Sequence, residues 1–345
     1  MSKRVLMVFL ILLVLTFSGC SKEKTSEVIS ETIYALGTVI DIQIYDENVD
    51  KAKKAIQESI ERITEIENKM SVNKDISEVI LINENAGENP VQVSEDTFYV
   101  LKKAKEYSKL SNGAFDLTIE PIVKLWGIGT EDARVPEKEE ITSLLNLVNY
   151  EDLKLDESTN KVQLNKKGQA IDLGGIAKGY AGDEIKRILL ENDINTAFIN
   201  LGGNVVTLGT KVDGSSWRIG IQNPLGDRGN YIAVLEVVDK TVVTSGNYER
   251  YFIEDGKRYH HIINPKTGYP AEEGIISSTI VTDKSIDADA LSTSVYVLGL
   301  EKGMELIESL DNVDAVIITE DKNVYITEGL KETFNIVDDS FILAN

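Results

Sequence analysis

Apolar residues recur at helical spacing in several segments of the 345-residue chain. In residues 51–70 they occupy every third or fourth position, as Ile56, Ile60 and Ile63 illustrate, and this period predicts an amphipathic helix. Residues 96–111 show the same period and predict a second one. The other helices that the pattern predicts lie over residues 176–192, 288–300 and 302–310.

Alternation of apolar and polar residues predicts strands in much of the remaining chain. Gly37 interrupts the first such segment, which therefore predicts two strands or a hairpin. Hairpin-like runs dominate the middle of the chain, whereas a doubly wound parallel sheet needs strands that alternate regularly with helices. We therefore expect an α+β fold of mixed, largely antiparallel sheets flanked by helices. The predicted strands lie over residues 33–44, 161–173, 197–208, 217–221, 231–238, 248–253 and 315–318.

The N-terminus has the pattern of an export signal. A basic pair, Lys3-Arg4, precedes an apolar run over residues 5–17, and the tripeptide Ser-Gly-Cys ends at Cys20. This order is typical of a signal peptide, and Cys20 resembles the lipid-modified cysteine of a bacterial lipoprotein. As the only cysteine of the chain, it also excludes an intramolecular disulfide. Phe17 stands where leucine is more usual and leaves an uncleaved signal anchor as the alternative.

These features predict three parts: a signal peptide over residues 1–19, a lipidated cysteine with a polar tether over residues 20–30, and one domain over residues 31–345. Two or more acyl chains anchor a protein stably, whereas one chain gives marginal binding. We therefore expect a protein that is lipid-anchored to the cell membrane and faces away from the cytoplasm.

Acidic residues outnumber basic ones, 57 to 36, and give a formal net charge of −21 at pH 7. Because binding to a phosphate backbone needs a basic surface, this charge argues against nucleic acid as a partner. A small anionic ligand would need a local device, such as a metal ion or a helix N-terminus.

One such device is predicted at AIDLGGIAKGYAGDEI, residues 170–185, where a strand turns through two glycines into a helix. Gly174 and Gly175 allow close backbone approach to a ligand, and the free N–H groups of the helix suit an anion. Lys178 in the first turn opposes the helix dipole, a conflict that an anionic ligand resolves. The alternative is a glycine-turned strand–helix junction with a surface lysine.

Asp289 and Thr293 are four residues apart on a predicted helix, so their side-chain oxygens share one face. A carboxylate and a hydroxyl suit Mg²⁺ together with phosphate or water. Asp283 and Asp287 add negative charge nearby and are further candidate ligands. The alternative is an aspartate-rich helix N-terminus in which the carboxylates only cap the helix.

His260 and His261 are the only histidines of the chain. Histidine suits proton transfer near neutral pH. Adjacent residues of a strand point to opposite faces, so at most one of the two enters a given site. With no second cysteine and no histidine pair on one face, a zinc enzyme is not expected. For each histidine the alternative to a catalytic role is a structural one, in which the imidazole is only hydrogen-bonded.

Taken in order, eight segments resemble the ApbE family of FAD:protein FMN transferases. The resemblance runs from about Ile33 to Gly299, nearly the whole predicted domain. The segments are LGT from Leu36, MSVNKDISEV from Met70, GAFDLTIEPIVKLWGIG from Gly113, AIDLGGIAKGYAGD from Ala170, INLGGNV from Ile199, SGNYERYF from Ser245, HHIINPKTGYP from His260 and DADALSTSVYVLG from Asp287.

The resemblance implies an Mg²⁺-dependent transferase with FAD as its substrate. An acceptor threonine or serine of an exported flavoprotein would attack the FMN phosphorus, His261 would assist deprotonation, and AMP would leave. Magnesium would be held by Asp289, Thr293 and a backbone oxygen near Gly175. The residues implied for the flavin-nucleotide site are Leu36, Asn73, Ala114, Phe115, Asp116, Asp172, Lys178 and Ile263.

Two positions depart from the family pattern. Asn73 stands where the family often has an aromatic ring that stacks on the flavin, so we expect weaker retention of FAD and easier hydrolysis. Leu36 replaces a frequent methionine and preserves its volume. Two alternatives to the transferase remain: a metal-dependent FAD pyrophosphatase that releases FMN and AMP, and a flavin-binding lipoprotein without turnover.

Overall fold

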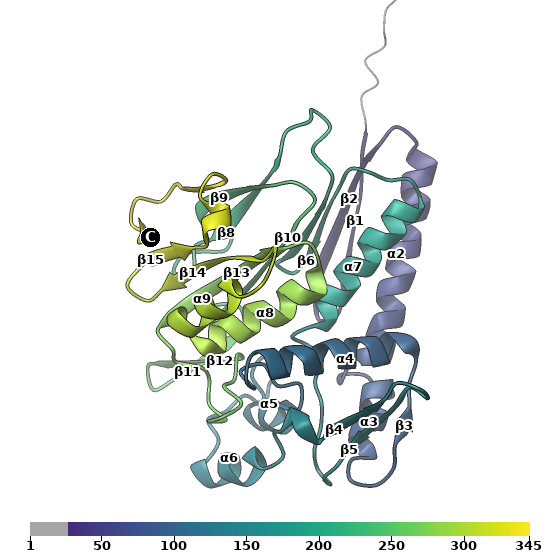
Figure 1. The fold of residues 1–345 in the computed structure, drawn as a ribbon, viewed down its shortest axis with the longest axis vertical. Helices are drawn as coiled ribbons and strands as arrows, with labels where there is room; N and C mark the ends of the chain where they lie inside the picture. The colour runs from purple at the N-terminus through teal and green to yellow at the C-terminus, as the bar shows by residue number, and fades with distance from the viewer. Residues whose placement is uncertain (1–26) are drawn as a thin grey trace, which may run out of the picture.

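The computed structural model describes residues 27–345 (Figure 1). The predicted signal peptide, Cys20 and the first part of the tether lie outside these residues. Within residues 27–345, no helix is both long enough and apolar enough to cross a membrane.

A nine-stranded sheet runs through the molecule, and all its neighbouring strands pair antiparallel except the last two, which are parallel. The α+β fold with largely antiparallel sheets is therefore confirmed. In spatial order the strands are β1 (Glu27–Ala35), β2 (Thr38–Asp46), β6 (Ala197–Leu201), β7 (Asn204–Leu208), β10 (Thr241–Gly246), β13 (Ile275–Thr282), β14 (Asp314–Thr319), β15 (Asn323–Ile326) and β17 (Ile342–Leu343).

Three smaller sheets accompany it. One consists of β8 (Trp217–Gln222), β9 (Tyr231–Val237) and β16 (Phe334–Ile336), and its apolar residues form a core cluster with strands β10, β13 and β14. The second consists of β3 (Val91–Gln92), β4 (Leu153–Asp156) and β5 (Lys161–Leu164). The third is a hairpin of β11 (Tyr251–Glu254) and β12 (Lys257–His260).

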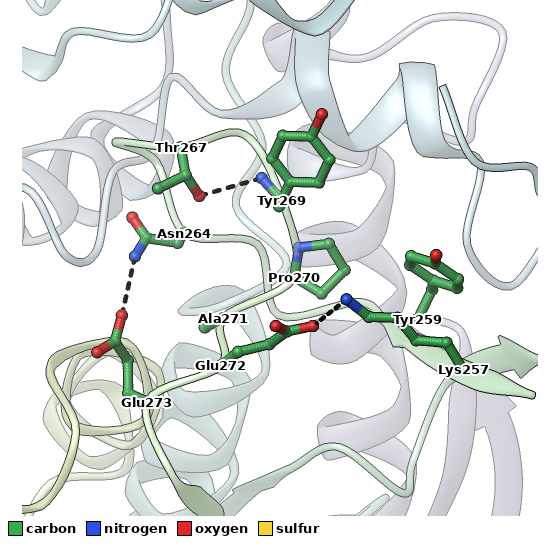
Figure 2. A pocket seen from close by; sticks show the side chains of 9 residues that line it. All are labelled: Lys257, Tyr259, Asn264, Thr267, Tyr269, Pro270, Ala271, Glu272 and Glu273. Atoms are coloured by element: carbon green, nitrogen blue, oxygen red, sulfur yellow. Dashed lines mark hydrogen bonds and ion pairs between the residues drawn. The ribbon is translucent and has the colours of Figure 1, made fainter. Parts of the chain in front are cut away.

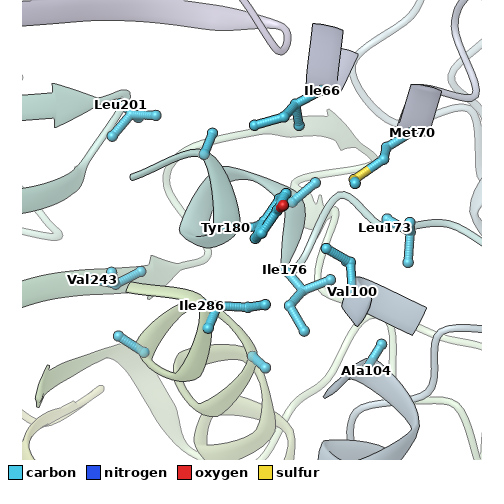
Figure 3. Packing of buried hydrophobic residues seen from close by; sticks show 14 of the residues in the cluster. Ile66, Met70, Val100, Ala104, Leu173, Ile176, Tyr180, Leu201, Val243 and Ile286 are labelled. Atoms are coloured by element: carbon cyan, nitrogen blue, oxygen red, sulfur yellow. The ribbon is translucent and has the colours of Figure 1, made fainter. Parts of the chain in front are cut away.

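Helices α2, α7 and α8 lie side by side against the large sheet (Figure 1). Their apolar faces and that of α4 meet in the main core, where Met70, Val100, Ile176 and Ile286 pack around Tyr180 (Figure 3). The helices are α2 (Val49–Met70), α3 (Glu78–Glu84), α4 (Glu95–Leu110), α5 (Glu120–Trp126), α6 (Lys138–Leu145), α7 (Ala177–Glu191), α8 (Ser285–Leu298) and α9 (Leu300–Glu308), with 3₁₀ turns at Tyr150–Asp152 and Glu328–Leu330.

Two strand predictions need correction, and two largely buried strands of the large sheet were missed. The strand expected over residues 161–173 is wrong beyond Leu164, because the chain turns at Gly168, whose φ is +86°. The strand expected over residues 248–253 begins only at Tyr251. Strands β10 and β13 were not predicted. Strand β13 is buried along its whole length, and a strand covered on both faces shows no alternation.

Candidate active site

The start of α7 lies directly against α8 because glycine makes room for it. A Cβ atom on Gly179 would come within 2.3 Å of the Ser285 carbonyl oxygen, so only glycine permits this approach. The Gly179 N–H then donates a 2.8 Å hydrogen bond to Oδ2 of Asp289 on α8. The glycine-rich turn and the aspartate helix, separated by more than a hundred residues, are thereby joined.

Four of the residues expected at the site meet at this junction. The Lys178 ammonium lies 3.3 Å from Asp289 Oδ1 and donates to the Gly174 carbonyl oxygen at 3.2 Å. A Cβ atom on Gly175 would lie 3.7 Å from the Thr293 hydroxyl oxygen. Gly175, Lys178, Asp289 and Thr293 therefore form one cluster of a cation and oxygen donors.

A second hydroxyl supports Thr293. Ser245 Oγ lies 3.4 Å from Thr293 Oγ1 and 2.8 Å from Ser292 Oγ, at the end of strand β10. The sequence pattern did not single out Ser245, although it opens the segment SGNYERYF.

This cluster suits a hard divalent cation. Asp289 is only 4% exposed, and its carboxylate, which has about four acceptor positions, receives two donors in the described part of the chain. Carboxylate, hydroxyl and carbonyl oxygens are the ligands that Mg²⁺ prefers. Among residues 27–345, however, no group of three or more histidine, cysteine, aspartate or glutamate side chains is arranged to hold a metal. Phosphate or water oxygens would have to complete the shell.

The two further acidic candidates are occupied elsewhere. Asp283 pairs with Lys240 at 2.6 Å and is largely exposed. Asp287 pairs with Lys103 of α4 at 3.1 Å. Asp287 and Asp289 are two residues apart on α8 and therefore point to different sides of the helix.

Asp172 lies at the glycine turn that precedes α7. Its Oδ1 accepts the Gly174 N–H, and its own N–H binds the Leu117 carbonyl oxygen at 2.9 Å. Burial raises the pKa of Asp172, and the Gly174 N–H, Lys178 and Arg250 act against that rise. Lys178 and Arg250 therefore both favour the ionised form of this carboxylate.

The two histidines have different environments. His260 is buried at the end of β12, with Nε2 3.0 Å from the Ala271 carbonyl oxygen and Nδ1 accepting the Ile262 N–H at 3.3 Å. His261 has Nδ1 3.2 Å from the Arg250 carbonyl oxygen. Because a carbonyl only accepts, Nδ1 of a neutral His261 carries the proton and Nε2 is the acceptor. Within residues 27–345, Nε2 of His261 has no hydrogen-bond partner.

Burial lowers the pKa of His261 to about 4, and the nearby Arg250 guanidinium lowers it further in the same direction. Burial likewise lowers the pKa of His260 to about 4. Both imidazoles are therefore neutral at pH 7. His261 is the one of the two with a free nitrogen that can receive a proton.

Arg250 is a second residue that the sequence pattern did not single out. It directly precedes β11, and its Nη2 donates to the Gly37 carbonyl oxygen at 3.2 Å. Arg250 and Lys178 influence the pKa values of the same two groups, Asp172 and His261. The sequence feature that could have pointed to Arg250 is its position in the segment SGNYERYF. Its charge alone does not distinguish it from the other arginines of the chain.

The β1–β2 turn holds Leu36 in a left-handed conformation. Leu36 has φ +53° and Gly37 φ +69°, as a two-residue type I′ hairpin turn requires. A leucine is rare at such a φ, and strain of this kind often accompanies functional sites. The Leu36 N–H donates to Glu67 Oε1 of α2 at 2.9 Å, which fixes the turn.

The other expected nucleotide-site residues are spread around this region. Asn73 is exposed in the loop after α2, with its N–H bound to Ser71 Oγ at 3.1 Å. Ala114 and Phe115 are buried in the main core, and Phe115 Cε2 would lie 3.0 Å from a Cβ atom on Gly175. Ile263 is buried in a separate apolar cluster with α5 and α6.

The Asp116 carboxylate is hydrogen-bonded by its own loop and by Tyr150. One oxygen accepts the Thr118 N–H at 2.8 Å and its hydroxyl at 2.6 Å, and the other accepts the Tyr150 N–H at 3.0 Å. Burial raises the pKa of Asp116, and these donors oppose the rise. Its carboxylate holds the loop that carries Phe115 to the Gly175 turn.

A cavity of about 280 Å³ is lined by residues of β12 and of the loop between Asn264 and Glu273 (Figure 2). Its wall includes Tyr259, Tyr269 and the Lys257–Glu272 ion pair of 2.6 Å. None of the expected site residues lines it. The predicted site residues that meet around Asp289 therefore lie outside this cavity.

Comparison with known proteins gives a consistent picture. The profile of the ApbE family matches residues 36–317. An FAD:protein FMN transferase of Klebsiella pneumoniae is 36% identical over 316 residues, which are 92% of this chain and 97% of the relative. One of Treponema pallidum is 34% identical and covers 89% of each chain.

Solved structures agree with this comparison. The ApbE protein of Thermotoga maritima superposes with a TM-score of 0.82 at 34% identity, over 89% of this chain and 99% of that one. The flavin transferase ApbE of Vibrio cholerae superposes with a TM-score of 0.81 at 28% identity, with the same coverage of each chain.

Proposed function

The chain belongs to the ApbE family, and from that premise we propose that it is an Mg²⁺-dependent FAD:protein FMN transferase. It is a transferase, as its relatives are. The finer proposal is that FMN passes from FAD to a threonine or serine hydroxyl of an exported flavoprotein and that AMP is released.

The observation that carries the proposal is the junction of α7 with α8. Asp289, Thr293 and the Gly175 turn offer oxygen ligands beside the Lys178 ammonium, 3.3 Å from Asp289. A dinucleotide has a charged diphosphate at its centre, so its site needs cations and free N–H groups at this point. Mg²⁺ held by Asp289, Thr293 and the Gly175 carbonyl would neutralise diphosphate charge.

The chain's own residues supply the remaining chemistry. The acceptor hydroxyl oxygen bonds to the FMN-side phosphorus, the bond from that phosphorus to the bridging oxygen breaks, and AMP leaves with the bridging oxygen. Nε2 of the neutral His261 receives the hydroxyl proton, because its Nδ1 proton is held by the Arg250 carbonyl oxygen at 3.2 Å. The Leu36 turn, Phe115 and Asp172 surround the nucleotide.

The proposal includes a place in the cell. Cys20 would carry the lipid that anchors the protein to the membrane, and the domain would face away from the cytoplasm, where exported acceptors fold. The support is the sequence pattern at residues 1–20.

A specific observation also favours hydrolysis of FAD as a second activity. Asn73 is exposed in its loop and offers no ring to stack on the flavin. A nucleotide that is held less firmly allows water to take the place of the acceptor hydroxyl, and FMN and AMP are then released without an adduct.

Intact-mass spectrometry tests these activities. The domain from Ser21 onward is incubated with FAD, Mg²⁺ and a candidate acceptor flavoprotein. A mass gain of one FMN on the acceptor, abolished by EDTA and by Asp289→Ala, is the expected result. FMN and AMP without an adduct would favour the pyrophosphatase, and unchanged FAD would favour a binding protein.

A further inference from the structure

The Arg250 side chain reaches across two glycine turns. From the start of β11 it extends to the β1–β2 turn, where Nη2 lies 3.2 Å from the Gly37 carbonyl oxygen. On the way it passes Gly129, on which a Cβ atom would lie 3.7 Å from Arg250 Cδ. Both glycines have positive φ, +69° and +91°. The guanidinium is thus positioned by backbone rather than by an acidic side chain.

No carboxylate of the described residues forms an ion pair with Arg250. In a chain of net charge −21, a guanidinium without an acidic partner is a positive charge that remains available. Only one of its five N–H donors is used within residues 27–345. The backbone of Arg250 lies at the site, because its carbonyl oxygen is 3.2 Å from Nδ1 of His261. Arg250 and Lys178 both act electrostatically on the pKa values of Asp172 and His261. Two cations therefore approach one region from different elements, Lys178 from α7 and Arg250 from β11.

We propose that Arg250, together with Lys178, binds the diphosphate of FAD and contacts the phosphoryl group that leaves with AMP. This inference rests on the proposed transferase function. A guanidinium presents two parallel donors that match two phosphate oxygens, which an ammonium does not. When the bond between the FMN phosphorus and the bridging oxygen breaks, the bridging oxygen gains negative charge, and a guanidinium hydrogen-bonded to that phosphate stabilises it. Arg250 is in this view a substrate-binding residue.

The competing explanation is mechanical. Arg250 also links β11 to the Leu36-Gly37 turn, so its removal could loosen the turn and weaken binding of every flavin. The two explanations differ for a ligand without phosphate. A phosphate contact affects FAD and AMP but not riboflavin, whereas a loosened turn affects riboflavin as well.

Arg258 provides a matched control on the same hairpin. Its guanidinium lies over the Tyr251 ring, 4.4 Å from the centroid, and its Nη1 donates to Asn247 Oδ1 at 3.4 Å. Like Arg250 it has no carboxylate partner among the described residues. It acts on the pKa of His260 rather than on that of His261.

The experiment is fluorescence titration of riboflavin and FAD, and calorimetric titration of AMP, with wild type, Arg250→Gln and Arg258→Gln. Mg²⁺ is present, acceptor is absent, and chromatography verifies that FAD stays intact. We expect Arg250→Gln to lower the affinity for FAD and AMP by roughly tenfold or more and the affinity for riboflavin by less than about twofold. Arg258→Gln should change none of the three by more than about twofold.

Unchanged FAD binding in Arg250→Gln, or an equal loss of FAD and riboflavin, would overturn the inference while leaving the transferase proposal intact. Failure of the wild type to bind FAD would instead contradict the proposed function. If thermal melting shows that Arg250→Gln does not fold, Arg250→Lys decides. Lysine cannot make the bidentate hydrogen bonds of a guanidinium, so Arg250→Lys should weaken the binding of FAD several-fold and leave the binding of riboflavin unchanged. Any other pattern contradicts the inference.

Discussion

The Lys178 ammonium lies 3.3 Å from Oδ1 of Asp289, and the N–H of the next residue, Gly179, binds the other carboxylate oxygen at 2.8 Å. Two adjacent residues of α7 thus hold one buried carboxylate of α8. A lysine in the first turn of a helix is unfavourable for the helix dipole, and the carboxylate offsets that cost. Asp289 is one of the residues that would hold a metal ion, and Lys178 would remain beside it as a cation for an anionic ligand.

Replacing this carboxylate should weaken Mg²⁺ binding at the proposed site. Asp289→Asn keeps an acceptor for the Gly179 N–H but removes the charge, so we expect Mg²⁺ affinity to fall by roughly tenfold or more and FMN transfer to be lost. Calorimetric titration with Mg²⁺ and intact-mass analysis of the acceptor measure the two effects.

Asp287→Asn is the matched control, since it changes the same residue type two positions away. Its carboxylate pairs with Lys103, so Mg²⁺ affinity should remain within about threefold of wild type. A similar loss of Mg²⁺ binding in both variants would show that general acidity of the helix, not Asp289, attracts the metal.

Gly179→Ala should destabilise the domain although alanine is the better helix former. The added Cβ atom meets the Ser285 carbonyl oxygen at 2.3 Å, and overpacking of this kind costs about 1–3 kcal/mol. The gain in helix propensity recovers about 1 kcal/mol. We therefore expect a net loss in the free energy of unfolding, measured by urea denaturation, together with weaker Mg²⁺ binding as α7 moves from Asp289.

Gly182→Ala is the comparison within the same helix. Its Cβ atom would lie 3.0 Å from two side-chain atoms, Ser285 Oγ and Val206 Cγ2. Side chains move more easily than backbone, so this variant should be less destabilised than Gly179→Ala. The reverse order would contradict the close contact of α7 with α8.

The sequence predicted amphipathic elements well and buried ones poorly. The helices α2 and α4 begin and end within two residues of their predicted limits, because each shows one polar face. Strand β13 is buried throughout and therefore carries no alternation that separates it from other apolar segments. The turn at Gly168 was missed for a different reason: the predicted strand was extended through residues 165–169, which contain no large apolar side chain and mark a turn.

The site could be predicted only where residue types and spacing carry chemistry. The four-residue spacing of Asp289 and Thr293 made them candidates, with helix capping as the alternative. The structure brings Asp289 to Lys178 and Thr293 to the Gly175 turn. Arg250 and Ser245 could not be found in that way, because their positions depend on turns and strands far apart in the chain. Asp116 shows the converse: a motif residue whose carboxylate is engaged by its own loop.

The pH dependence of transfer tests His261. Its pKa is lowered to about 4, so the neutral imidazole is already the main form at pH 6. We expect the rate to stay high between pH 8 and pH 6 and to fall only as the pH approaches about 4. An acid limb near the ordinary histidine value of about 6.5 would mean that His261 is not held as the geometry indicates.

Stability must be followed over the same pH range. Both histidines have folded pKa values of about 4, below 6.5. At these two residues the unfolded chain binds more protons between these values, so their contribution to the free energy of unfolding falls as the pH drops from 6.5 toward 4. The pKa values of Glu120 and Asp183, raised by burial to about 8 and about 6, act in the opposite direction. Thermal melting at each pH separates the net change in stability from the titration of the catalytic step. His261→Gln should lose transfer across the whole range while remaining folded.

An aromatic ring at position 73 should restore firm binding of the flavin. Asn73 is exposed in the loop after α2, so a larger side chain disturbs no packing there. A ring stacked on the isoalloxazine contributes about 0.5–1.5 kcal/mol, and Asn73→Tyr should therefore tighten FAD by roughly two- to tenfold. Release of FMN and AMP without acceptor should slow accordingly, and chromatography of the nucleotides measures it.

Ile76→Tyr is the control for this change, because Ile76 is 75% exposed in the same loop. If both variants tighten FAD equally, any added aromatic surface on the loop suffices and position 73 has no special relation to the flavin. If only Asn73→Tyr does so, the asparagine is the feature that leaves the nucleotide weakly held and open to water.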